Sequence, residues 1–132
     1  MSKIVDVINK LPELLPLKPA TEIDVKDAEI QLRVSFNEEY KDYLMAFGAI
    51  MADGIELTGI AKSAHRNVVA QTKQERELNP KVPNTMYVIE NTGVDGIIIW
   101  QDTAGTIYQS YPETKPKKIA DSLSSYLSRL IL

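Results

Sequence analysis

The 132-residue chain contains no cysteine and only one histidine, and these shortages remove several kinds of chemistry. Disulfide bonds and thiolate catalysis are excluded because both need cysteine. A zinc site built from cysteine and several histidines is excluded for the same reason. His65 could act alone as a general base, but no nucleophile lies near it in sequence, so we interpret it as a surface histidine.

Long apolar runs and phosphate-binding glycine motifs are also missing. The apolar run at residues 97–100, like every other apolar run in the chain, is far too short to span a bilayer. The first ten residues lack the apolar core and small-residue cleavage site of a secretory signal. No Walker A loop, nucleophile elbow or Gly-x-Gly-x-x-Gly motif occurs, so we interpret the glycines near positions 93, 96 and 105 as turn residues. We therefore expect a cytoplasmic protein with no membrane segment, metal or cofactor.

Basic side chains are absent from residues 86–111, which hold three acidic ones. Residues 21–56 hold nine acidic and three basic side chains, whereas residues 57–81 hold two acidic and five basic ones. Two acidic segments would repel phosphate groups, so nucleic acid is disfavoured as a partner and a basic protein is favoured. The alternative is an ordinary solvated surface that binds nothing.

The apolar periodicity predicts an α+β fold in one domain covering residues 1–132. Helical spacing is found in five segments, at residues 3–11, 21–32, 37–47, 67–78 and 122–132. Strands are expected at residues 55–58, 86–89, 97–100 and 106–111, the last three forming an antiparallel meander. Three prolines predict an extended connector at residues 12–19, and residues 112–118 are expected to form a basic loop.

Residues 28–48 carry the most specific pattern in the chain. A short helix is followed by a break at residues 35–37, and Asn37 is placed to cap a second helix that ends at Gly48. This pattern resembles the amino-terminal signature of the SUKH superfamily, Leu-Gly-x-x-Leu-Pro-x-x-Tyr-x-x-Phe/Tyr-Leu followed by Gly-Gly. The matching residues are Leu32, Phe36, Tyr40, Tyr43, Leu44 and Gly48.

Three residues depart from that signature: Arg33 replaces its first glycine, Asn37 its proline and Ala49 its second terminal glycine. The resemblance continues through a helical segment at residues 68–80 and the meander at residues 86–108, and covers residues 22–131. The SUKH superfamily includes fungal cell-wall-assembly regulators and bacterial immunity proteins that neutralise polymorphic toxins. The resemblance therefore implies an α+β binding protein without catalytic activity.

The charge balance, and not the family resemblance, suggests which residues contact a partner. We select five acidic residues in or beside expected turns and strand ends: Asp53, Glu56, Glu90, Asp95 and Asp102. Trp100 and the tyrosines at 87, 108 and 111 have two interpretations, since aromatic side chains fill cores and also anchor protein interfaces.

Glu90 and Asp102 also admit a catalytic interpretation. Both are expected at strand ends, and paired carboxylates can act as acid and base in hydrolysis. They can equally cap turns or remain solvated. We favour the non-catalytic interpretation, because no substrate pocket is indicated by the sequence.

Two functions fit these observations. In the first, the chain is an immunity protein whose acidic surface occludes the basic active cleft of a cognate toxin domain. Toxins bound by members of this superfamily are often nucleases. In the second, it is an intracellular scaffold or regulatory module of the same fold. A toxin gene next to the gene for this chain would favour the first function.

Overall fold

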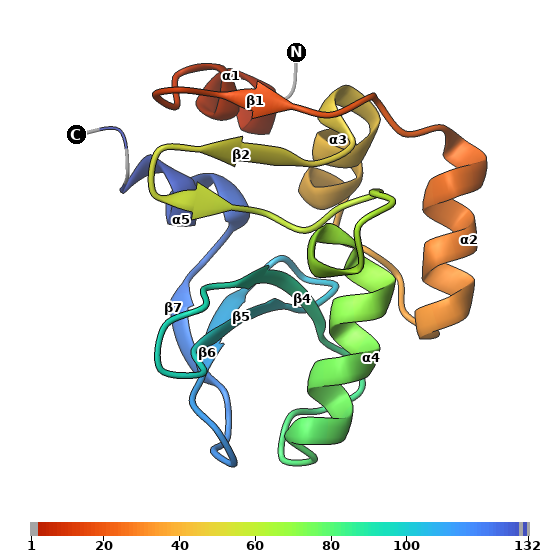
Figure 1. Cartoon of the computed structure of the whole chain (residues 1–132), viewed down its shortest axis with the longest axis vertical. Helices are drawn as coiled ribbons and strands as arrows, with labels where there is room; N and C mark the ends of the chain where they lie inside the picture. Colours follow the sequence, from red (N-terminus) through yellow and green to blue (C-terminus); the bar gives the residue numbers. More distant parts are fainter. Residues whose placement is uncertain (1–2, 130, 132) are drawn as a thin grey trace.

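The computed structural model describes residues 3–129 and residue 131 (Figure 1). This part of the chain forms five α-helices: α1 (Lys3–Asn9), α2 (Glu22–Leu32), α3 (Glu38–Phe47), α4 (Val68–Leu78) and α5 (Leu123–Ser128). One antiparallel sheet contains β1 (Leu15–Pro16), β2 (Ile50–Ala52) and β3 (Ile55–Glu56). A second antiparallel sheet contains β4 (Tyr87–Asn91), β5 (Ile98–Gln101), β6 (Ile107–Ser110) and β7 (Lys117–Ala120). The predicted α+β class is confirmed.

The ends of α2 and α3 are fixed by local hydrogen bonds. The Thr21 side chain accepts from the backbone N–H of Asp24, whose carboxylate accepts from the N–H of Thr21, so the two residues form a capping box. Asn37 caps α3 by accepting from the N–H of Glu39 at 3.0 Å, as predicted. Gly48 ends α3 with φ +74, and a Cβ there would lie 2.0 Å from the carbonyl oxygen of Lys18. Glycine is therefore required at position 48 by backbone conformation and by space.

The second sheet is a four-stranded meander in the order β4-β5-β6-β7. All four residues of β5 are buried, as expected for an apolar strand that lies between two others. Thr58, just after β3, joins the two sheets: its N–H donates to the Ile89 carbonyl and its hydroxyl to the Val88 carbonyl. The helix α4 packs on β4, where the Thr72 hydroxyl accepts from the N–H of Val88.

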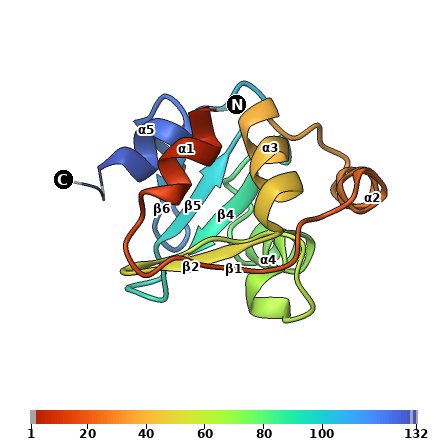
Figure 2. The same cartoon turned by 90° about the horizontal axis from the view of Figure 1, so that it is seen from above.

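An aromatic cluster lies between the helices and the meander. Phe36, Tyr40, Tyr43 and Tyr87 are each at most 2% exposed, and neighbouring rings lie 4.8–5.5 Å apart between centroids. The buried phenols are hydrogen-bonded; the Tyr43 hydroxyl donates to the Thr58 carbonyl at 2.7 Å, and the Tyr87 hydroxyl to Gln101 Oε1 at 2.8 Å. Viewed from above, α1 lies between α3 and α5 (Figure 2), and all three helices contribute to this main core.

Trp100 belongs to a smaller second core with residues that include Val82 and Met86. It is 0% exposed, and its indole N–H donates to the Ser110 hydroxyl at 2.9 Å. Of its two interpretations, core packing is confirmed and the interface anchor is wrong. Tyr87 is equally buried, whereas Tyr111 is 49% exposed.

The strand predictions were incomplete at the sheet edges. Residues 15–16, expected in an extended connector, form the edge strand β1. They pair with β2, and neither strand was predicted. Pro16 is compatible with β1 because this edge strand has only one neighbour, so a missing N–H is tolerated. Residues 117–120, assigned in part to a loop, form β7 and extend the meander from three strands to four. Lysine is common on such edges because its charge discourages pairing with other chains.

The carboxy-terminal helix is shorter than predicted, since α5 ends at Ser128 and the prediction extended to position 132. Leu123 and Tyr126 lie in the core as expected. Leu130, within the predicted helix at residues 122–132, lies outside the described residues. None of the described helices has the length and apolar character needed to traverse a bilayer.

Candidate functional site

Three of the five selected acidic residues lie at one side of the molecule. Asp53 is in the turn between β2 and β3, Glu56 is the last residue of β3, and Asp95 is in the turn between β4 and β5. Both turns lie at the left of Figure 1, the β2–β3 turn above the β4–β5 turn. Asp53 and Asp95 are exposed, and Asp95 adopts φ +53, which asparagine and aspartate tolerate better than most residues.

Glu90 lies beneath this side and does not present its carboxylate to solvent. The residue is only 7% exposed; Oε1 accepts from the Tyr126 hydroxyl at 2.8 Å and Oε2 from the N–H of Glu56 at 3.2 Å. Burial raises the pKa of Glu90, and the hydrogen bond from Tyr126 opposes that rise. The prediction that Glu90 is exposed to a partner is therefore wrong. The continuous burial of β4 on both faces is the reason.

Glu56 connects the buried carboxylate to the surface. Its backbone binds Glu90, while its own Oε1 lies 2.8 Å from His65 Nε2. The His65 side chain is 57% exposed, as expected for a surface histidine. Its pairing with Glu56 could not be predicted, because eight residues separate the two in sequence and no local pattern brings them together.

Asp102 lies at the other end of β5 and stabilises a turn. Its Oδ1 accepts from the N–H groups of Gly105 and Thr106 at 3.0 and 3.1 Å, and its Oδ2 accepts from the Tyr108 hydroxyl at 2.9 Å. The same turn contacts the start of α3, where the Thr103 hydroxyl donates to the Ser35 carbonyl. The turn-capping interpretation of Asp102 is confirmed, and this residue is separate from the acidic group around Asp53.

The fold does not bring Glu90 and Asp102 together as a catalytic pair. Glu90 is opposite Ile99 in the β4–β5 register, and Asp102 lies three residues further along β5. Three strand residues correspond to about 10 Å of backbone. The two carboxylates also share no hydrogen-bond partner in the described part of the chain. Glu90 accepts from Tyr126 and from the Glu56 N–H, whereas Asp102 accepts within its own turn and from Tyr108. Within residues 3–129 and 131, no group of three potential metal ligands is found.

An exposed apolar strip borders the acidic group and was missed from sequence. Leu15 is opposite Met51 in the β1–β2 register, and Met51 is opposite Glu56 in the β2–β3 register, so the three side chains share one sheet face. Leu15 is 64% exposed and Met51 37%. We call Leu15, Met51, Asp53 and Glu56 the hairpin face. The only sequence signal was an isolated apolar pair between prolines, and its meaning depended on the strand pairing.

Family comparison agrees with this architecture. A family model named SUKH_5 and described as SMI1-KNR4 cell-wall matches residues 1–132. The chain belongs to the SUKH_5 family. The SUKH resemblance inferred from residues 28–48 and the meander is thereby confirmed.

One similar solved structure is a crystal structure of a protein from Pseudomonas syringae pv. tomato. The similarity covers 92% of this chain and 93% of that chain, with 19% identity and a TM-score of 0.74. At this identity the likeness shows a shared fold and nothing about function. No curated protein matches the chain.

The signature residues of this SUKH_5 chain build its fold and are not available to a partner. Leu32, Phe36, Tyr40, Tyr43 and Leu44 are each at most 2% exposed. Arg33, which stands in the place of the first signature glycine, adopts φ +57 and ψ +44 at the end of α2. This left-handed conformation explains why glycine suits that position.

Proposed function

We propose that this SUKH_5 chain is a non-catalytic binding protein that recognises a basic protein partner through the hairpin face. The observation that carries the proposal is the exposed pair Leu15 and Met51 beside the carboxylates of Asp53 and Glu56. Protein interfaces commonly combine a central apolar patch with a polar rim. Asp95, in the β4–β5 turn, adds a further exposed carboxylate on the same side of the molecule.

We propose further that the partner is a toxin domain and that the chain acts in the cytoplasm as its immunity protein. In this mechanism the hairpin face covers the basic active cleft of the toxin and excludes its substrate. Opposite charge speeds the encounter, whereas the apolar contacts slow dissociation. Support comes from family membership and from the acidic character of the surface; no covalent chemistry is required of this chain.

The alternative function is a regulatory or scaffolding role with no cognate toxin. The description of the matching family as SMI1-KNR4 cell-wall is the observation that favours it. Both functions use a protein-binding surface, so they differ in the partner and not in the mechanism of recognition.

The test is co-expression with the product of an adjacent toxin-like gene. Leu15→Arg and Met51→Arg place a charge in the apolar strip, and each should abolish co-purification and protection of the host cell. Ile23→Arg is the matched control, since Ile23 is 81% exposed on α2, outside the hairpin face. Loss of binding in the Ile23 variant with retention in the other two would contradict the proposed surface. Binding without protection would favour the regulatory function.

A further inference from the structure

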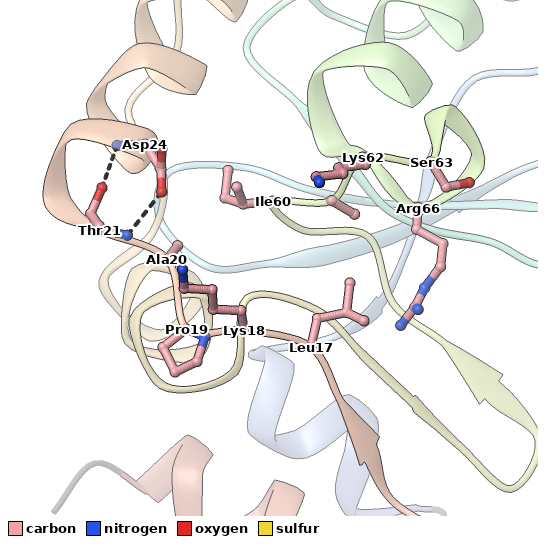
Figure 3. A pocket seen from close by; sticks show the side chains of 11 residues that line it. Leu17, Lys18, Pro19, Ala20, Thr21, Asp24, Ile60, Lys62, Ser63 and Arg66 are labelled. Atoms are coloured by element: carbon pink, nitrogen blue, oxygen red, sulfur yellow. Dashed lines mark hydrogen bonds between the residues drawn. The ribbon is translucent and has the colours of Figure 1, made fainter.

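A basic groove lies next to the hairpin face, between the segment leading into α2 and the loop that follows β3 (Figure 3). Its volume is about 610 Å³. Leu17 and Pro19 line one wall, and Ile60 lines the other. Leu17 is 37% exposed and Ile60 is partly buried. The groove therefore offers apolar surface that the core does not use.

Three cationic side chains border this groove: Lys18 on one wall, and Lys62 and Arg66 on the other (Figure 3). None of the three forms an ion pair with any residue that the structure describes. The single acidic side chain in the lining, Asp24, already accepts from the N–H of Thr21 in the capping box. The groove thus combines apolar walls with unneutralised positive charge, in contrast to the acidic hairpin face.

Arg66 has hydrogen-bond donors that lack an acceptor in the part of the chain that the structure describes. Its Nε and Nη2 atoms are shielded from solvent and have no hydrogen-bond acceptor among the described residues. A shielded donor without an acceptor is unfavourable, and the few that occur in native proteins call for an explanation. Nε and Nη2 lie on the same edge of the guanidinium group. A carboxylate can accept from both at once, in the bidentate arrangement that arginine favours.

We propose that this groove binds an acidic peptide segment of a protein. A glutamate or aspartate carboxylate of that segment pairs with the Nε–Nη2 edge of Arg66, and a neighbouring apolar side chain packs against Leu17 and Ile60. Lys18 and Lys62 flank the segment and attract its remaining negative charge. Since the two guanidinium atoms are shielded, the side chains that cover them move aside on binding. The site is distinct from the hairpin face and takes a ligand of opposite charge, so it does not depend on the function proposed above.

A fluorescein-labelled peptide of alternating leucine and glutamate, with its terminal carboxylate amidated, is the probe. Fluorescence anisotropy should show saturable binding to the wild type, and amide chemical-shift changes should centre on residues 17–20 and 60–66. Arg66→Lys keeps the charge and removes the bidentate edge; we expect Kd to rise about 30-fold, because one of the two charge-assisted hydrogen bonds is lost. Lys18→Gln with Lys62→Gln should raise Kd about three- to tenfold.

Two controls make the result specific. Lys73→Gln with Lys81→Gln removes the same charge at exposed positions outside the groove, and should leave Kd within about twofold. The lysine double variant in the groove changes only exposed side chains, so it tests the site even if Arg66→Lys fails to fold. No detectable binding at millimolar peptide would overturn the proposal. Equal affinity for a control peptide in which every glutamate is replaced by glutamine would also overturn it. So would displacement of the probe by a single-stranded oligonucleotide at a lower concentration than by the unlabelled peptide.

Discussion

The backbone of Arg33 adopts a conformation that is unfavourable for residues other than glycine. It is held in the left-handed region at the end of α2, a conformation that costs a non-glycine residue about 1 kcal/mol. The side chain is exposed and has no ion pair within the described residues, so little is lost by removing it. The glycine that the family signature places here would relieve the strain.

We therefore predict that Arg33→Gly raises the free energy of unfolding by about 0.5–1 kcal/mol. Lys26→Gly, in the interior of the same helix, should lower it by about 1 kcal/mol because glycine disfavours helical conformation. Urea denaturation monitored by circular dichroism measures both. Equal destabilisation by the two substitutions would show that the conformation of Arg33 carries no strain.

The burial of Glu90 makes the stability of the fold depend on pH. Because burial raises its pKa in the folded protein, the folded state holds the Glu90 proton more tightly than the unfolded chain does. Its contribution to stability is therefore fully present below the unfolded pKa, and is lost as pH rises through the folded pKa. Glutamine at position 90 keeps an acceptor for Tyr126 and has no charge to bury, although it loses the acceptor for the Glu56 N–H.

We predict that the free energy of unfolding of Glu90→Gln rises relative to that of the wild type as the pH is raised from about 4 to about 7. The lost hydrogen bond lowers the variant's stability by a similar amount at both values, so only the change between them reports on the charge. Urea unfolding of both proteins at the two pH values measures it. A constant difference would mean that the carboxylate is not penalised by its surroundings.

At the scale of elements, the contact between two glycines holds the end of α3 against the segment after β3. A Cβ on Gly59 would lie 1.9 Å from the Gly48 carbonyl oxygen, and neither backbone can move without breaking hydrogen bonds. The Ile60 N–H donates to that same carbonyl at 3.0 Å. This close approach also sets one wall of the basic groove, because Ile60 lines it.

We expect Gly59→Ala to lower the free energy of unfolding by about 3 kcal/mol or more, within the range seen when a buried backbone must shift. Gly54→Ala is the control: its φ is +79, but no atom lies within 4 Å of the added Cβ, so the cost should be about 1 kcal/mol. Thermal unfolding compares the two. A larger loss at position 54 would contradict the close contact.

The inner face of α3 carries the main core. Leu44 is 0% exposed, whereas its neighbour Met45 is 39% exposed. Leu44→Ala should lower the free energy of unfolding by about 2–5 kcal/mol through cavity formation, and Met45→Ala by less than about 1 kcal/mol. Equal, small effects in chemical denaturation would show that this face of α3 is not tightly packed.

At the scale of the whole molecule, the net charge of −3 matters less than its distribution. The exposed carboxylates of the hairpin side and the cations of the groove form separate regions of opposite sign. A basic partner approaching the hairpin face would be steered by the first region.

Charge reversal by Asp53→Lys with Asp95→Lys should therefore lower the association rate with the proposed toxin about tenfold at low salt. Added salt should bring the wild-type rate toward that of the variant, because it screens exposed charges. Asp27→Lys with Glu77→Lys makes the same net change at exposed positions on α2 and α4, away from both turns, and should have little effect. Stopped-flow measurements over a salt series test this. An association rate that does not change with salt would contradict electrostatic steering. It would not contradict occlusion of the toxin cleft.

The helices and the inner strands could be predicted from sequence because their signals are local. Asn37 caps the residues that follow it, Gly48 ends the helix that precedes it, and the apolar spacing of α3 matches its buried face. The family signature reports the same buried positions, which is why it identified the fold and points to no surface residue.

Only the tertiary structure decided which polar and apolar residues reach the surface. Glu90 is buried because Tyr126 and the Glu56 backbone, both distant in sequence, converge on it. Leu15 and Met51 form an exposed strip because two short segments on either side of α2 and α3 pair as strands. Capping and helical periodicity act over three or four residues, whereas pairing and burial depend on contacts between distant segments.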